Sequence, residues 1–227
     1  MSTVDLSLYH VMRLPEIPPA PGAKSPVLLM LHGVRSNEDD LFSLTPYIDE
    51  RFCIISIRAP LTLGPGQYGW YHVTFYPDHI DRDAHELELA RQKLVAFIGE
   101  VVKAYDVDPR RVYLMGFSQG AIMSLALMLT KPRLLAGVVA MSGSLPDEVL
   151  PISADAQKLQ GFQAIIVHGV QDDVIPVAEA RRLRDYLAGL PIVLDYREYP
   201  MRHQISDQSL DDVSGWLIAQ LDKSQAG

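Results

Sequence analysis

The sequence predicts an α/β fold with a mostly parallel central sheet and helices on both faces. Short apolar runs rich in β-branched residues recur along the chain, and helical patterns separate them. A continuous apolar run of roughly four to eight residues is typical of a strand buried on both faces, and strands alternating with helices form βαβ units. The 227 residues are 48% hydrophobic, enough for one packed core, so we expect a single domain over residues 1–227.

The predicted strands are spread over the whole length of the chain. An edge strand is expected at about residues 6–14, followed by a proline-stiffened loop at residues 15–26. The other strands are continuous apolar runs, at Val27–Leu31, Cys53–Ile57, Val112–Met115, Gly137–Met141, Ala164–Val167 and Ile192–Tyr196. These runs are too short to cross a bilayer, so no stable membrane insertion is expected.

The clearest predicted helix covers about residues 82–105, where apolar residues recur at spacings of three and four between charged ones. Further helices are expected after Gln119, near Val177 and near Ser206. Residues 58–81 are rich in aromatic residues and show no such pattern. We predict an irregular loop there, and a long loop in a compact domain is commonly functional.

Composition excludes several function classes. The formal net charge is −8 and there is no block of Lys and Arg, which argues against a nucleic-acid partner. Cys53 is the only cysteine, so neither an internal disulfide nor a thiolate zinc cluster is expected. Residues 1–22 lack the basic and apolar regions of a secretory signal, and we expect a cytoplasmic protein.

The segment Gly116-Phe117-Ser118-Gln119-Gly120 fits the pattern G-x-S-x-G between a predicted strand and a predicted helix. In this pattern the serine stands at a sharp turn, and the glycines relieve steric crowding on either side. The helix that follows favours negative charge developing at its N-terminus. Ser118 is therefore the candidate nucleophile, rather than merely a small residue in a tight turn.

A serine hydroxyl needs an adjacent base, which a third group orients. His203 is the only histidine beyond the last predicted strand and is the candidate base. Asp172 and Asp173 follow the strand that ends near Val167, and local chemistry does not separate them as the orienting acid. Asp147 is a weaker third choice.

Acyl transfer also needs donors for the oxyanion, commonly the N–H after the nucleophile and one from an early strand–helix loop. These are the backbone N–H groups of Gln119 and of Val34, which follows His32-Gly33 at the end of an apolar strand. We expect His32 to be structural. His72, His79 and His85 show no helical ligand pair with a carboxylate, so no metal site is expected, and no cofactor is expected either.

Four motifs occur in order along the chain: LHGVRSNEDDLF, GFSQGA, HGVQDDVIP and YPMRHQIS. Together they resemble the serine carboxylesterase and lysophospholipase family of α/β-hydrolases, which includes the acyl-protein thioesterases. The resemblance covers about residues 26–220. It implies an α/β-hydrolase fold with Ser118 as nucleophile, His203 as base and Asp172 as the acid.

The same resemblance implies that Val34 and Gln119 supply the oxyanion donors. The family usually has an aromatic loop near the site, and Trp70 and Tyr71 resemble it, which suggests that they bind substrate.

Two positions depart from the family pattern: Arg35 and Arg202 stand where the family commonly has glycine. If either position requires a positive φ, its loop must differ locally. One hypothesis is that both arginines bind substrates carrying a carboxylate or phosphate. The alternative is that they face solvent or pair with nearby acids, at Glu38, Asp39 and Asp40.

We therefore predict a serine carboxylesterase that hydrolyses short- to medium-chain esters through an acyl-enzyme. An acyl-protein thioesterase or lysophospholipase is the nearest alternative, and a hydrolase fold used only for binding is another. The expected partner is a small-molecule or acyl-ester substrate, with a homodimer left open. We expect pocket walls from residues 61–80 and 143–160.

Overall fold

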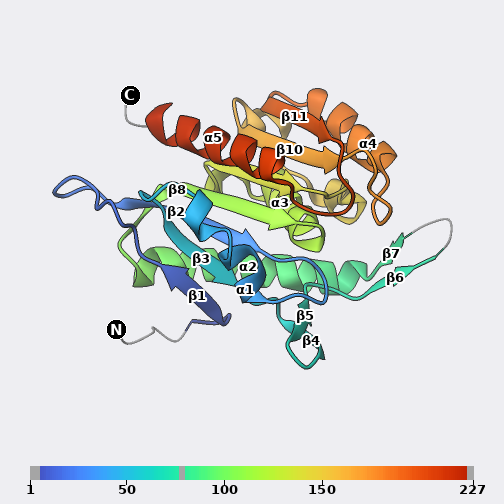
Figure 1. Ribbon diagram of the computed structural model, residues 1–227, viewed down its shortest axis with the longest axis horizontal. Helices are drawn as coiled ribbons and strands as arrows, with labels where there is room; N and C mark the ends of the chain where they lie inside the picture. The colour runs from blue at the N-terminus through green and yellow to red at the C-terminus, as the bar shows by residue number, and fades with distance from the viewer. Residues whose placement is uncertain (1–5, 77–79, 224–227) are drawn as a thin grey trace.

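The computed structural model describes residues 6–76 and 80–223. At its centre is a seven-stranded sheet in the order β1-β3-β2-β8-β9-β10-β11 (Figure 1). The strands are β1 (His10–Arg13), β2 (Ser25–Leu31), β3 (Cys53–Ile57), β8 (Val107–Phe117), β9 (Gly137–Met141), β10 (Gln163–Gly169) and β11 (Val193–Tyr199). β1 is antiparallel to β3, and the other neighbouring pairs are parallel. The predicted mostly parallel sheet is confirmed.

Helices cover both faces of this sheet (Figure 1). They are α1 (Glu38–Phe42), α2 (Ala84–Ala104), α3 (Gln119–Thr130), α4 (Val177–Ala188) and α5 (Asp207–Lys223). Alternate residues of a strand point to opposite faces. In β2, Leu29 packs in one core with α2, α3 and α4, whereas Leu28 and Met30 pack in a second core with α1 and α5. The continuous apolar strands of the sequence are explained by these two cores.

The lengths and compositions of the helices decide whether any of them could cross a membrane. Within residues 6–76 and 80–223, none of them combines the length and the apolar composition that a bilayer-spanning helix requires. Short 3₁₀ helices complete the connections, at Thr45–Tyr47, Pro132–Leu134, Asp147–Ile152 and Ala156–Leu159.

The aromatic stretch at residues 58–81 differs from the predicted irregular loop. It forms two antiparallel hairpins, β4 (Leu61–Gly64) with β5 (Gln67–Gly69), and β6 (Val73–Phe75) with β7 (Ile80–Arg82). Residues 77–79, between β6 and β7, lie outside the described residues. Strands of three or four residues contain too few alternations of apolar and polar residues to produce a recognisable period. The five-residue α1 is likewise too short to show a helical period, so the sequence does not predict it.

The topology positions the predicted site residues. The carboxyl ends of parallel strands meet at one edge of the sheet, where α/β proteins bind ligands. Ser118 directly follows β8, Asp172 follows β10 and His203 follows β11. Segments far apart in the sequence are thereby brought to a common edge.

Candidate active site

Ser118 occupies a strained turn between β8 and α3. Its backbone angles are φ 53° and ψ −117°, in a region that costs an L-residue about 1–3 kcal/mol. The flanking glycines allow this turn, because a Cβ on Gly116 would lie 2.2 Å from the carbonyl oxygen of Gly120. The serine therefore stands at an apex that no larger flanking residue would permit.

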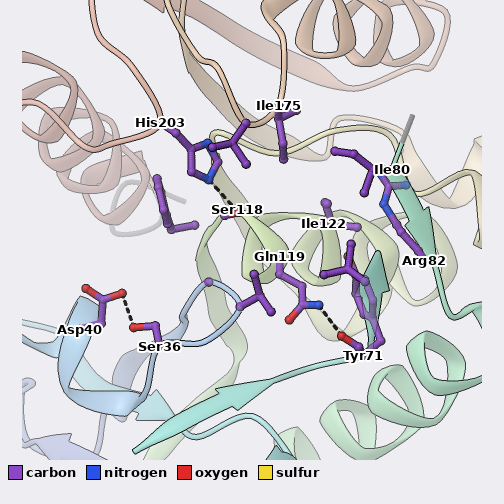
Figure 2. Close-up of a pocket in the computed structure, with 15 residues that line it drawn as sticks. Ser36, Asp40, Tyr71, Ile80, Arg82, Ser118, Gln119, Ile122, Ile175 and His203 are labelled. Carbon is purple, nitrogen blue, oxygen red and sulfur yellow. Dashed lines mark hydrogen bonds between the residues drawn. The ribbon is translucent and has the colours of Figure 1, made fainter. Parts of the chain in front are cut away.

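The structure brings Ser118, His203 and Asp172 together. His203 Nε2 lies 2.9 Å from Ser118 Oγ, the hydrogen bond drawn in Figure 2. On the other side of the imidazole ring, Nδ1 lies 2.8 Å from Asp172 Oδ2. Ser118 and Asp172 are both buried. This chain of two hydrogen bonds has the connectivity of a nucleophile, a base and an orienting acid.

Both oxygens of the Asp172 carboxylate accept hydrogen bonds. Oδ1 accepts the backbone N–H groups of Val174 and Ile175 at 2.9 and 2.8 Å, while Oδ2 accepts from His203. Burial alone would raise the pKa of Asp172, but the hydrogen bonds from His203 and the two amides hold it below its ordinary value. An ionised carboxylate can only accept, so His203 carries its proton on Nδ1 and presents Nε2 as an acceptor to Ser118.

The two alternative acids lie elsewhere. Asp173 is exposed, and its Oδ2 lies 3.3 Å from Nη1 of Arg202. Asp147 forms a two-pronged ion pair with Arg182. Geometry therefore distinguishes Asp172 from Asp173, which local chemistry could not.

Gly169 has a positional role that the sequence reasoning missed. It ends β10, and a Cβ there would lie 2.2 Å from the carbonyl oxygen of Met201 and 2.5 Å from that of Arg202. The absence of a side chain lets the loop before His203 pack directly on the strand. The imidazole also contacts the Phe117 ring, with centroids 5.0 Å apart. The available signal was the glycine in the His168-Gly169 pair that precedes the acid.

Val34 and Gln119 line the same cavity as Ser118. In the described part of the chain, neither backbone N–H donates to a protein acceptor. Gln119 is the first residue of α3, where a helix leaves its N–H groups without intrahelical partners. Both groups are therefore available to an oxyanion.

The side chain of Gln119 fixes the segment after β5. Its Nε2 donates to the Tyr71 carbonyl at 2.7 Å, and its Oε1 accepts from the Trp70 N–H at 2.8 Å. The Trp70 indole donates to the His32 carbonyl at 2.9 Å and is fully buried. Tyr71 lines the cavity and Trp70 does not, so only one of the two aromatic residues predicted to bind substrate is placed to touch it.

His32 is structural, as expected. It is fully buried, with Nδ1 at 2.7 Å from the Gly33 carbonyl and Nε2 accepting the Ala59 N–H at 3.1 Å. Burial lowers the pKa of the imidazole, which therefore stays neutral. Both ring nitrogens are occupied in tying the end of β2 to the segment after β3.

The cavity beside Ser118 has a volume of about 300 Å³. Its walls are mainly apolar, formed by Tyr71, Val73, Ile80, Phe117, Ile122, Val174 and Ile175. Residues 61–80 supply part of this wall, as expected. The expectation for residues 143–160 is wrong, because no side chain of that segment lines the cavity. Arg82, which sequence reasoning did not single out, does line it.

The two arginines that replace glycine behave differently. Arg35 has a φ of 61°, and its N–H donates to the Tyr68 carbonyl at 2.8 Å. It therefore adopts the left-handed conformation itself, and the loop need not differ. Arg202 is not among the described residues with positive φ. Both side chains are exposed, and neither lines the cavity.

The alternative expected for these arginines was that they face solvent or pair with Glu38, Asp39 and Asp40. Both are exposed, in agreement with its first part, but neither pairs with these acids. Arg202 pairs with Asp173, and Glu38 is instead hydrogen-bonded to Arg58. This removes the structural basis for anion binding by Arg35 and Arg202 within the cavity.

Residues 12–220 match the phospholipase/carboxylesterase family. A probable inactive carboxylesterase of Oryza sativa subsp. japonica is 26% identical over 217 residues, covering 88% of this chain and 87% of its own. Acyl-protein thioesterase 1 of Gibberella zeae is 27% identical over 177 residues, covering 73% of each chain.

Solved structures show the same fold. The carboxylesterase of Bacillus cereus has a TM-score of 0.80 at 21% identity, covering 94% of this chain and 95% of its own. Esterase PE8 has a TM-score of 0.76 at 26% identity, covering 95% and 99%. The fold is that of an α/β-hydrolase, and the protein is a hydrolase of the carboxylesterase and thioesterase type. The chain belongs to the phospholipase/carboxylesterase family.

Proposed function

We propose that this protein is a serine carboxylesterase that hydrolyses short- to medium-chain carboxylic esters through an acyl-enzyme. The observation that carries the proposal is the 2.9 Å hydrogen bond between Ser118 Oγ and His203 Nε2, with Asp172 behind the imidazole. No cofactor is invoked. The family includes a relative described as inactive. The hydrogen-bonded arrangement here favours catalysis over a purely binding role.

In the proposed reaction, Ser118 Oγ attacks the ester carbonyl carbon while its proton passes to His203 Nε2. The N–H groups of Val34 and Gln119 bind the resulting oxyanion, and one such donor is worth about 10²–10³ in kcat. The carbon–oxygen bond to the alcohol then breaks, and the alcohol leaves with the proton from His203. Water, deprotonated by the same imidazole, releases the acid and restores Ser118.

The size of the cavity supports a short acyl group. Its volume of about 300 Å³ is at the lower end of the roughly 300–1,000 Å³ typical of small-molecule sites. Ile80, Ile122 and Ile175 are among its walls. Such walls favour a hydrocarbon chain of limited length.

A thioesterase is the second candidate, supported by the similarity to acyl-protein thioesterase 1 of Gibberella zeae. The acyl-enzyme would be the same, and a thiol would leave in place of an alcohol. Matched oxygen and sulfur esters of one acyl group distinguish the two: a higher kcat/KM on the sulfur ester favours the thioesterase.

The direct test is a panel of p-nitrophenyl esters, from acetate to decanoate, assayed on the wild type and on Ser118→Ala. Ser124→Ala is the matched control, because Ser124 lies in the same helix, bonds to the Gly120 carbonyl and does not line the cavity. We expect Ser118→Ala to lose at least about 10³-fold in kcat, and Ser124→Ala to stay within about threefold of the wild type. Activity that survives in Ser118→Ala would contradict the proposal.

A further inference from the structure

Arg82 places a guanidinium group on the wall of the cavity that contains Ser118. Its side chain is only 11% exposed. Nη2 donates to Ser144 Oγ at 2.5 Å, and Nη1 donates to the Leu145 carbonyl at 3.2 Å. These contacts come from the segment after β9 and hold the guanidinium in place. A fixed, largely buried cation on a reaction cavity requires an explanation beyond packing.

The charge of Arg82 is only weakly compensated by the acid that pairs with it, Glu148. The Glu148 carboxylate approaches Nη1 at 3.4 and 3.5 Å, outside the roughly 2.7–2.9 Å of a strong charge-assisted bond. Other arginines of this chain form close two-pronged pairs, such as Arg91 with Glu88 at 2.6 and 2.7 Å. Arg82 therefore retains positive charge that can act on the contents of the cavity.

The opposite end of the cavity carries the opposite charge. Asp40 lines it there, with Oδ2 accepting from Ser36 Oγ at 2.7 Å. Figure 2 shows Ser36 and Asp40 on one side of Ser118, and Ile80 and Arg82 on the other. An anionic group bound beside Ser118 is repelled from the Asp40 end and attracted to the Arg82 end. The cavity is thus polarised along the direction in which a substrate must lie.

We infer that Arg82 determines specificity for esters that carry a carboxylate, which binds the guanidinium while Ser118 attacks the ester carbonyl. The inference rests on the proposed function. The apolar side chains of Ile80, Ile122 and Ile175 line the same cavity, so the carboxylate and the ester are joined by a short hydrocarbon spacer. The substrate class is a half-ester of a small dicarboxylic acid or an ester of a small hydroxy acid. The inferred anion-binding residue is thus Arg82, rather than Arg35 or Arg202.

The test compares matched esters with and without the carboxylate. One arm uses p-nitrophenyl hydrogen glutarate against p-nitrophenyl pentanoate, which places the charge on the acyl side. The second uses the butanoate ester of 4-hydroxybutanoate against butyl butanoate, which places it on the alcohol side. In at least one of the two arms, we expect the wild type to show at least tenfold higher kcat/KM for the carboxylate substrate than for its neutral counterpart.

Arg82→Met should lower kcat/KM for the carboxylate substrate 10- to 100-fold more than for the neutral ester of the same pair, mainly through KM. Ser144→Ala is the control, because it removes one contact that fixes Arg82 and keeps the charge. It should retain the preference. Arg82→Lys should retain part of it.

The inference is overturned if the wild type cleaves neutral esters with no preference for the carboxylate in either arm. It is also overturned if Arg82→Met lowers kcat/KM equally for the carboxylate and the neutral esters, since Arg82 then only holds β7 in place. A wild type that cleaves none of the four esters contradicts the proposed function instead, and this inference with it.

Discussion

A Cβ atom on Gly120 would lie 1.9 Å from the carbonyl oxygen of Leu31. The first turn of α3 therefore packs directly on the end of β2, with no room for a side chain between them. This contact brings the turn that carries Ser118 beside the loop that carries Val34. The second glycine of the G-x-S-x-G pattern thus serves the packing of two backbones as well as the turn.

Gly120→Ala should destabilise the fold by at least about 2 kcal/mol, because the added methyl group must displace backbone. Urea unfolding followed by circular dichroism measures this change. Gly99→Ala is the control, since Gly99 is exposed in α2 and a Cβ there meets nothing within 4 Å. It should stabilise by about 0.5–1 kcal/mol. Equal effects of the two substitutions would refute the close approach.

Arg35→Gly should be more stable than Arg35→Ala by about 1 kcal/mol, because only glycine adopts a φ of 61° without strain. Chemical denaturation of the two variants gives the difference. Both should keep the wild-type ratio of kcat/KM for anionic and neutral esters, because Arg35 does not line the cavity. A changed ratio would restore Arg35 as a substrate-binding residue.

Asp172→Asn should lower kcat about 10⁴-fold with little change in KM. An amide can donate to Nδ1 of His203, which favours the tautomer that cannot take a proton from Ser118. The neighbouring Asp173→Asn should stay near wild-type activity, because Asp173 is exposed and pairs with Arg202 rather than with His203. Steady-state kinetics of the two variants decide the assignment, and a larger loss in Asp173→Asn would reverse it.

The Tm of the wild type should fall more steeply in acid than the Tm of Asp172→Asn. The pKa of Asp172 is lower in the fold than its unfolded value near 3.9, so its ionisation contributes stability above that pH. This contribution is lost as the pH falls through the lower, folded pKa. The Tm of the wild type should therefore fall more between pH 6 and pH 3 than that of the variant. Parallel Tm curves would show that Asp172 is not linked to acid unfolding.

The sheet was predictable because β2, β3, β9 and β10 are buried on both faces, which leaves continuous apolar runs such as Val27–Leu31. β1 was anticipated with wider limits than the observed His10–Arg13. The two hairpins of residues 61–82 were not predicted, since their pairing depends on contacts rather than on period. One such contact is the bridge between Ser36 and Tyr68, which ties β5 to the loop after β2.

The predicted nucleophile, base and acid meet because each follows a parallel strand, and the positions of these strands along the chain can be read from the sequence. Arg82 and Gly169 could not be found in this way. Arg82 is held in place by a hydrogen bond to Ser144, 62 positions away. Gly169 is needed because the backbone of Met201 packs directly against it. Trp70 shows the converse: an aromatic residue near a site can pack beneath it rather than line it.

The central claim is that Ser118 is the nucleophile, activated by His203. Labelling with a fluorophosphonate, followed by intact-mass and peptide analysis, tests it most directly. We predict one adduct per chain, located on Ser118, with much slower labelling in His203→Ala. An unlabelled wild type, or an adduct on any other residue, would contradict the account.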